Sequence, residues 1–401
     1  EVPLTDNASG RDFMKAMEGW SAISNNIFVW DYGINFDNYV SPFPNFPILQ
    51  KNIQLFKEHH ATMHFSQIGG SKGGDFPEMR AYMVSKLMWN PYQNADSLMR
   101  AFMDGYYGAA SPYIYQYEKL LEGGLLASKQ RLWIYDSPVT HKDGMLNANC
   151  RKRYNQLFDQ AEQAVMADPV LLKRVQISRL PLQYAELEIA RAEGNHDLNE
   201  IKAKLTLFDE RTREFGIPTL NERKNSPADY CRLYAERYLP GKEKNLAKGA
   251  KVIWIQEPTG KYKALGETAL TDELFGGTTF VESWVGWEGM DGAFILDLGK
   301  DTLFSSIESD FLHQLGQWIL LPEKVTYSIS SDNNTWQPFG EKNLPEDRSV
   351  QVKFVGVKCD KPSPVSGRYI KVEIVGTKIC PSWHYGVGYP SWFFLDEVTV
   401  H

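Results

Sequence analysis

Cysteine, positive charge and long apolar runs are all scarce in this sequence. Its 401 residues include 4 cysteines, which are too few for a disulfide framework and lack the C-x-x-C spacing of a zinc site. Cys359 and Cys380 flank one predicted strand, so they either pair in an oxidising compartment or remain two buried thiols. No run reaches the roughly 18 consecutive apolar residues that a transmembrane helix requires, and we therefore expect no membrane span.

The charge balance is mildly acidic, with 43 Lys and Arg against 50 Asp and Glu and a net charge of −7. A chain without a basic surplus does not attract phosphate backbones or anionic lipid, so nucleic acid is a poor partner. Aromatic residues, by contrast, are plentiful, with 11 Trp, 20 Tyr and 21 Phe. Aromatic surface of this amount serves large cores or the stacking of ligands such as carbohydrate.

Residues 1–125 show a mixed α/β pattern. Short apolar runs at 27–30 and 63–65 are typical of parallel strands that are covered on both faces, and residues 48–56 between them have helical spacing. This order predicts a right-handed βαβ unit. Two parallel strands cannot bury both of their faces, so we expect the end of a larger domain, with partner strands missing from the N-terminus.

The remaining chain divides into a helical segment and a strand-rich segment. Residues 126–245 have apolar side chains at every third or fourth position, which predicts antiparallel helices packed as a small bundle, with Pro181 starting or kinking a helix. Residues 246–401 have short alternating runs separated by Gly, Pro and Asn or Asp turns, a pattern typical of a β-sandwich with jelly-roll character. The predicted fold class is therefore multidomain α+β.

Six segments of the strand-rich part occur in one order along the chain. They are residues 269–273, 286–289, 296–300, 327–336, 368–372 and 395–398. This order resembles the discoidin or F5/8 type C family, the fold of many carbohydrate-binding modules. Residues 311–312, 318–319, 380–384 and 392–397 are similar to the version appended to bacterial hexosaminidase-type glycosidases. The resemblance implies a discoidin-like sandwich over residues 246–401.

The aromatic and imidazole side chains of this part have two possible uses. In one, they clamp loops and fill the end of the sandwich; in the other, an exposed ring packs on the C–H side of a pyranose while neighbouring polar groups bond its hydroxyls. We expect Trp383, His384 and Tyr385 to bind substrate, because they lie in a loop rich in Gly, Pro and Ser, where side chains are commonly exposed. The other candidates are Trp284, Trp287, Trp318, Tyr389 and Trp392.

The discoidin resemblance also implies a structural calcium ion. Asp272 and Glu397 match carboxylate positions of that family, and backbone carbonyls near Gly276 and Thr278 would complete an oxygen shell. The alternative is that Asp272 is a turn residue and that Glu397 pairs with a lysine.

Residues 1–125 carry a second resemblance. The residues that match are 19–20, 28–32, 35–36, 39, 42–45, 80–82, 86–91 and 105–108. They look like the C-terminal part of DUF4838, a large uncharacterised bacterial family that is similar to α-glucuronidase and hexosaminidase (β/α)8 barrels. The resemblance implies that residues 27–30 and 63–65 are the seventh and eighth strands of a barrel end, with the earlier strands absent.

Active sites of such barrels lie at the carboxyl ends of the strands. The resemblance therefore implies a sugar pocket at the ends of these two strands, with Asp31 as a catalytic residue. Its expected substrate-binding residues are Trp30, Tyr32, Asn35 and Gln67. Glycoside hydrolysis generally needs two carboxyl groups, and only Asp31 is well placed, so we expect the acid and base carboxylates upstream of Glu1. The alternative for Asp31 is a strand-end residue that bonds loop amides.

These patterns predict a carbohydrate-active protein. The first hypothesis is the C-terminal portion of a bacterial glycoside hydrolase, with a partial (β/α)8-barrel end (1–125), a helical domain (126–245) and a sugar-binding sandwich (246–401), inactive as this chain alone. The second is a non-catalytic glycan-binding or scaffold protein. The expected partner is an oligosaccharide or polysaccharide, and no organic cofactor is expected. Residues 1–5 lack a secretory signal pattern, so the protein is cytosolic or its leader is absent; the resemblances favour the periplasm, the cell surface or secretion.

Overall fold

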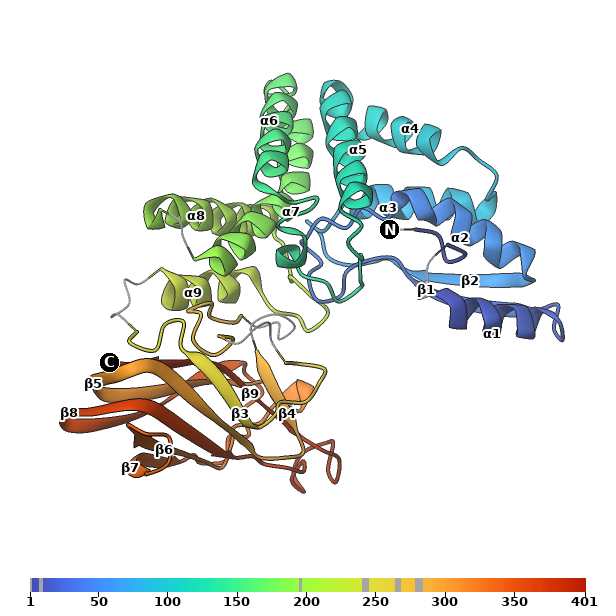
Figure 1. The fold of residues 1–401 in the computed structure, drawn as a ribbon. Coiled ribbons are helices and arrows are strands. Elements are labelled where there is room, and N and C mark those ends of the chain that lie inside the picture. The colour runs from blue at the N-terminus through green and yellow to red at the C-terminus, as the bar shows by residue number, and fades with distance from the viewer. Residues whose placement is uncertain (1, 7–9, 195–196, 240–244, 264–267, 278–283) are drawn as a thin grey trace. The chain divides into compact units, whose positions relative to one another are not determined.

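A computed structural model describes the chain except for residues 1, 7–9, 195–196, 240–244, 264–267 and 278–283 (Figure 1). The described residues form two compact units. Unit 1 comprises residues 1–190 and 195–235, and unit 2 comprises residues 191–194 and 236–401. The boundary predicted between 125 and 126 lies inside unit 1, because one apolar core extends from Phe46 to Ile189.

Unit 1 begins with a small parallel sheet that is covered by helices on one face. The elements are α1 (Arg11–Ser21), β1 (Ile27–Tyr32), α2 (Phe46–Glu58), β2 (Ala61–Gln67) and α3 (Pro77–Trp89). β1 and β2 pair in parallel, as the order strand, helix, strand predicts. Val29 of β1 is buried with Met17 of α1 and Phe56 of α2, which identifies the covered face. Over the described residues this sheet has two strands, so a (β/α)8 barrel is not seen and its remaining strands stay a prediction.

The chain continues through a series of helices. They are α4 (Ala95–Tyr107), α5 (Ser111–Ser128), α6 (Ala148–Ala164), α7 (Pro169–Glu193), α8 (Leu198–Phe215) and α9 (Pro227–Tyr238), with 3-10 turns η2 (Gly108–Ala110) and η3 (Pro138–His141). Local signals set several ends: the Asn94 side chain accepts the Ser97 N–H at the start of α4, and Gly216, with φ of +63°, ends α8. α7 continues through Pro181, so this proline does not start a helix.

Unit 2 is built from antiparallel strands. They are β3 (Lys251–Gln256), β4 (Val285–Glu288), β5 (Gly292–His313), β6 (Lys324–Ser330), β7 (Gln337–Asn343), β8 (Lys353–Val375) and β9 (Trp392–Val400), with a 3-10 turn η4 (Leu315–Gln317). The order is β4-β9-β5-β8-β6-β7, with β3 beside β5. The long strand β5 pairs with β3 through its first part and with β9 through its last part, and it shifts register in between. The predicted strand-rich segment is confirmed, and its discoidin identity stays a prediction.

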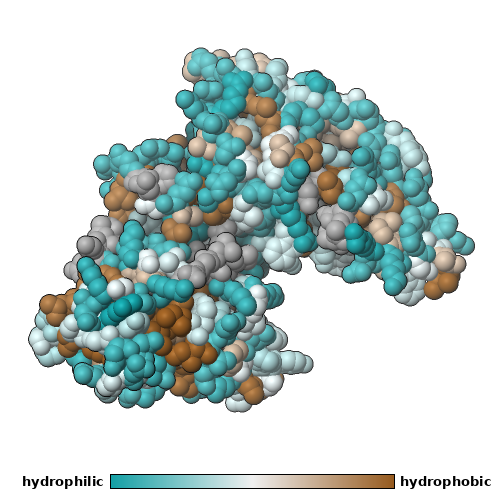
Figure 2. All heavy atoms as spheres, viewed as in Figure 1, coloured by the Kyte–Doolittle hydropathy of each residue, from teal (hydrophilic) through white to brown (hydrophobic). Residues whose placement is uncertain are grey.

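The core of unit 2 uses part of the tryptophan surplus. Trp284 and Trp287 are fully buried and stack on Phe354 at 5.9 Å and on Phe393 at 5.0 Å between ring centroids. Both therefore take the packing role that was one of their two predicted uses. Figure 2 shows a largely hydrophilic surface with apolar side chains gathered over the strands of this unit.

Two further features concern the pairing of the cysteines and the presence of membrane-spanning helices. All four cysteines are free thiols, so Cys359 and Cys380 follow the unpaired alternative. Among the residues that the structure describes, no helix combines the length and apolar composition needed to cross a bilayer.

Candidate functional site

The two faces of the β1–β2 sheet differ in chemistry. Val29, Asp31 and His64 lie on the face that α1 and α2 cover, because side chains alternate along a strand. The opposite face carries large apolar side chains whose exposed fractions are 45 to 57%. These open-face residues are Phe28, Trp30, Tyr32, Met63 and Phe65.

Asp31, the predicted catalytic residue, lies on the covered face. Its Oδ1 is 2.9 Å from Nε2 of His64, and the His64 ring packs edge-on against Phe56 at 5.2 Å. The structure therefore does not place Asp31 beside Trp30 and Tyr32, the substrate-binding residues predicted with it. The sequence analysis did not identify His64 as the partner of Asp31. The strand register offered a signal, because Asp31 pairs with Ser66, and His64 lies two residues before Ser66 on the same face of β2.

Trp30 and Gln67 do come together, as the predicted pocket requires. The Trp30 indole N–H donates to Oε1 of Gln67 at 3.3 Å, and the Trp30 ring lies 4.8 Å from that of Phe65. Tyr32 pairs with Gln67 in the strand register. These three predicted residues share the open face at the carboxyl ends of β1 and β2.

Asn35, the fourth predicted substrate-binding residue of unit 1, is buried at 3% exposure. Its Nδ2 donates to the carbonyl of Asp136 at 2.8 Å, and its Oδ1 accepts the backbone N–H groups of Asp37 and Asn38 at 3.1 and 2.9 Å. Burial and these three bonds leave the amide little access for a ligand. Asn35 therefore positions the loop that follows β1.

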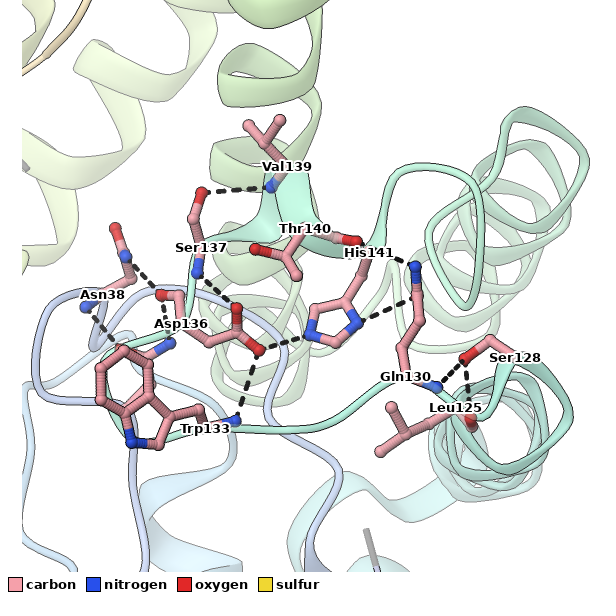
Figure 3. A network of polar contacts seen from close by, with 11 residues as sticks. Asn38, Leu125, Ser128, Gln130, Trp133, Asp136, Ser137, Val139, Thr140 and His141 are labelled. Atoms are coloured by element: carbon pink, nitrogen blue, oxygen red, sulfur yellow. Dashed lines mark hydrogen bonds and ion pairs between the residues drawn. The ribbon is translucent and has the colours of Figure 1, made fainter. Parts of the chain in front are cut away.

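Asp136 is the centre of the polar network drawn in Figure 3. Its carbonyl also accepts Nδ2 of Asn38 at 2.8 Å, and its carboxylate contacts Nε2 of His141 at 2.6 Å and accepts the Ser137 N–H at 2.9 Å. Oε1 of Gln130 lies 3.3 Å from the other ring nitrogen of His141. The network attaches the loop after β1 to the irregular segment between α5 and η3.

In unit 2, the predicted loop residues differ in exposure. His384 is buried at 3%, its Nε2 lies 3.1 Å from the Leu315 carbonyl, and its Nδ1 accepts the Gly386 N–H at 3.0 Å. Tyr385 is exposed, and its hydroxyl donates to the Gly316 carbonyl at 2.8 Å. His384 therefore holds the loop, while Tyr385 presents a ring to solvent.

Trp383 is anchored at the edge of the same loop. Its indole N–H donates to Oε2 of Glu346 at 2.6 Å, and the Arg348 guanidinium lies 5.0 Å from its ring centroid. The bonds from Trp383 and from Arg348 lower the pKa of the Glu346 carboxyl. An ionised carboxylate and a guanidinium therefore border the ring.

Trp318 and Tyr389 complete the group. The Trp318 ring lies 6.1 Å from Tyr385 and 5.7 Å from Tyr389, and Tyr389 is exposed. We call Trp318, Tyr385 and Tyr389 the unit 2 ring cluster. Trp392, by contrast, is partly buried and packs on Tyr262 and Phe394.

The predicted calcium carboxylates lie close together. Oδ1 of Asp272 accepts the Leu274 N–H at 2.9 Å, and Oε1 of Glu397 accepts the Glu273 N–H at 2.8 Å. Oε2 of Glu397 is buried and has no hydrogen-bond partner among the described residues. Burial, the charge of Asp396 and a hydrogen bond with Asp272 raise the pKa of Glu397 well above its usual value.

A cation between these carboxyls would satisfy the buried oxygen and replace the shared proton. The Gly276 carbonyl accepts the Tyr238 hydroxyl at 2.7 Å, which leaves one lone pair for a metal. Thr278 lies outside the described residues. Over the part of the chain that the structure describes, no group of three or more His, Cys, Asp or Glu side chains has the arrangement of a metal site, so backbone and solvent oxygens would have to complete the shell.

Glu397 also lines an open cavity of about 400 Å³ within unit 2. Asp310 lines it too and pairs with Arg237 at 2.5 Å, and Arg237 reaches the buried Asp396 at 3.2 Å. Burial raises the pKa of Asp396 despite this cation. Arg237 therefore balances the charge of the carboxylates beside it. The remaining carboxyl group at the cavity, Glu397, has one oxygen without a hydrogen-bond partner among the described residues.

Comparison with known proteins gives one family match. The profile of a family described as a domain of unknown function, DUF4838, matches residues 1–119. No curated protein matches the chain significantly.

Several solved structures are similar to parts of the chain. The module CpGH89CBM32-6 produced by Clostridium perfringens is 17% identical over 39% of this chain and 98% of its own, with a TM-score of 0.26. A fucose binding module of Streptococcus pneumoniae, SpX-3, is 12% identical over 40% of this chain and 98% of its own, with a TM-score of 0.27. A GH29 fucosidase of Ruminococcus gnavus is 18% identical over 49% of this chain and 36% of its own, with a TM-score of 0.28.

The resemblance of the N-terminal residues to DUF4838, predicted over residues 1–125, is thus confirmed over residues 1–119.

Proposed function

We propose that the protein binds carbohydrate through the unit 2 ring cluster. One observation carries this proposal: Tyr385 and Tyr389, exposed at 68% and 62%, lie beside Trp318, and the Tyr385 hydroxyl is tied to the backbone. A soluble protein rarely leaves large rings exposed in a group unless the surface binds a partner.

The chemistry of the border favours a sugar as that partner. Ring faces accept the C–H side of a pyranose, and the hydroxyls of the sugar need polar groups at the edge of the rings. Glu346 and Arg348 beside Trp383 are such groups. The His384 ring lies between those of Trp383 and Tyr385, at 5.8 and 4.6 Å, so His384 acts in this proposal by positioning its neighbours.

The test is binding of the full chain to a glycan array, followed by calorimetry with each sugar that binds. Tyr385→Ala and Tyr389→Ala should each weaken binding about tenfold, because each removes one stacking face, and Trp383→Ala should weaken it less. Trp89→Ala is the matched control, since Trp89 is 90% exposed and lies in unit 1. An array without a hit, or equal affinities for Tyr385→Ala and the Trp89 control, would reject the proposal.

A second proposed function is the one predicted first from sequence, the C-terminal portion of a glycoside hydrolase that acts in the periplasm, at the cell surface or outside the cell. The parallel pair β1 and β2 supports it, because Trp30, Tyr32 and Gln67 share one face at the carboxyl ends of these strands. We expect this chain by itself to release no nitrophenol from a panel of nitrophenyl glycosides, because Asp31 lies on the covered sheet face. Turnover that disappears in Asp31→Asn would contradict this expectation and make Asp31 catalytic.

We also propose that Asp272 and Glu397 hold a structural calcium ion. Thermal unfolding of metal-stripped protein should shift upward when calcium is added, because an ion that binds only the folded state stabilises it. Glu397→Gln should remove the shift, whereas Glu341→Gln on the exposed strand β7 should retain it. Identical melting curves with calcium and with EDTA would exclude the ion.

A further inference from the structure

The His141 side chain of unit 1 contacts two acceptor oxygens at once (Figure 3). Its ring is buried at 2% exposure, with Nε2 2.6 Å from Oδ2 of Asp136 and Nδ1 3.3 Å from Oε1 of Gln130. We call these two contacts the His141 latch. A neutral imidazole carries one N–H and can donate to only one of the two oxygens. Both contacts are hydrogen bonds only when each ring nitrogen carries a proton.

The orientation of the Gln130 amide is fixed independently of His141. The amide Nε2 of Gln130 donates to the Thr140 carbonyl at 3.0 Å. Turning the amide would bring its oxygen against that carbonyl, and turning the imidazole would bring C–H groups against both acceptors. The Gln130 oxygen therefore stays toward the ring, and the geometry indicates the imidazolium form of His141.

The latch joins two parts of an irregular segment. The chain between α5 and η3 forms no helix or strand, and Gln130 and Asp136 lie near its two ends. His141 itself lies on η3, so its ring ties both ends of the segment to one turn. A change at this ring therefore reaches Trp133 and Tyr135, which the segment exposes to solvent.

The other charged side chains in the neighbouring segments are paired with each other or exposed. They are Lys142 and Asp143, which pair at 2.7 Å, Asp37 and Arg223, which pair at 2.6 Å, and the exposed Lys129 and Arg131. Asp136, with 8% of its side chain exposed, is the charged group in contact with the ring. A buried carboxylate bonded to an imidazole stabilises the protonated ring.

We propose that the His141 latch is a pH-sensitive device that controls the segment between α5 and η3. The imidazolium closes the latch by donating to Asp136 and to Gln130. As the pH rises, the Nδ1–H bond breaks and its proton passes to water, because the carboxylate holds the Nε2 proton more strongly than an amide oxygen holds the other. The Nδ1 lone pair then faces the Gln130 oxygen, and their repulsion releases the start of the segment.

Nitrogen NMR of the full chain, labelled at its 8 histidines, tests the charge state. His141→Gln assigns the His141 signals by removing them. At about pH 5.5 both ring nitrogens should be protonated, and at about pH 8.5 Nδ1 should have lost its proton while Nε2 keeps its own. A His141 ring that keeps the same number of protons over this range would overturn the proposal.

Hydrogen exchange measures the response of the segment itself. Between about pH 6 and pH 9, after correction for the intrinsic rate, the amides of residues 129–137 should lose about tenfold in protection, the effect of one hydrogen bond to a charged group. His60→Asn should respond in the same way, because His60 is exposed beyond α2 and its φ of +63° suits asparagine. Unchanged protection, or an equal loss throughout unit 1, would overturn the proposal.

Two variants separate a titrating latch from a ring that only fills space. His141→Gln keeps a donor for Asp136 but does not titrate, so the protection of the segment should no longer change with pH. Gln130→Glu places a second carboxylate at Nδ1 and should move the release upward by about one pH unit. A pH response that survives in His141→Gln, or a release at the same pH in Gln130→Glu, would overturn the proposal.

Discussion

The two sheets of the protein contain the same cross-strand aromatic pair in opposite environments. In unit 2, Trp287 of β4 pairs with Phe393 of β9 in the strand register, and both rings are buried. In unit 1, Trp30 of β1 pairs with Phe65 of β2 in the same way, and both rings are about half exposed. The ring centroids are 5.0 and 4.8 Å apart, but the buried rings are stacked, with 9° between their planes, whereas the exposed rings meet edge-on at 69°. Whether an aromatic residue becomes core or surface is therefore decided by what lies above the sheet.

The largest effect that tests this comparison is expected for the buried aromatic pair in the sheet of unit 2. Trp287→Ala should lower the free energy of unfolding by about 3–5 kcal/mol, because it leaves a cavity in a packed core. Urea unfolding followed by circular dichroism measures the change. A loss below about 1 kcal/mol would mean that the core of unit 2 collapses around the missing ring.

The sheet of unit 2 also buries the carboxyl group of Glu397 in β9, and the titration of this group makes the stability of the protein depend on pH. The folded-state pKa of Glu397 is raised above its unfolded value of 4.5, so the folded protein binds the extra proton and stability falls as pH rises above 4.5. In EDTA, the free energy of unfolding should therefore be lower at pH 8 than at pH 5.

Glu397→Gln should remove part of this dependence, because the amide does not titrate, while the buried Asp396, whose pKa is also raised, should retain the rest. Thermal melts across this pH range provide the measurement, and Glu341→Gln is the control for loss of an exposed carboxyl. Stability that rises with pH in EDTA would contradict the assignment of Glu397 as the responsible group.

The loop that follows the β1–β2 sheet is expected to depend on hydrogen bonds more than on packing. Asn35→Ala removes one donated and two accepted hydrogen bonds in a buried loop, and it should cost about 1–3 kcal/mol. Unfolding experiments measure the loss. A loss well below about 1 kcal/mol would mean that other groups or water replace the bonds of the Asn35 side chain.

The smallest effect is expected for the exposed member of the comparison. Trp30→Ala should change the free energy of unfolding by less than about 1 kcal/mol, because the ring already contacts water. The measurement is the same urea titration that is applied to Trp287→Ala. Equal losses for the two variants would mean that the open face of β1 and β2 is covered in solution.

The elements that sequence predicted best are those with a strong local pattern. The apolar runs at 27–30 and 63–65 lie within β1 and β2, and the helical spacing at 48–56 lies within α2. Alternation likewise identified the apolar parts of β5 and β8 at 294–298 and 369–374. The remaining parts of these two long strands contain polar residues and Pro362 and Pro364, and they are extended because of their partners.

The candidate sites were harder to predict, because they depend on contacts between distant segments. Trp133 and Tyr135 lie where a helical pattern was expected to continue from residue 126, but the chain is irregular between α5 and η3. His384 and Asn35 are polar residues in loops, and their sequence context therefore favoured exposed side chains. In the structure both are buried and form hydrogen bonds with backbone carbonyls. No local pattern shows that a polar side chain is needed by a backbone group about 69 or 101 residues away.

The Asp136 carbonyl has a consequence for protein engineering. Because this carbonyl accepts hydrogen bonds from both Asn35 and Asn38, the shape of the loop that follows Tyr32 depends on a residue about one hundred positions later in the chain. A transplant of residues 32–38 into another scaffold would lose its conformation, whereas a transplant that also carries residues 130–141 would bring the necessary acceptors. Homologues that exchange one of these segments are therefore expected to exchange the other with it.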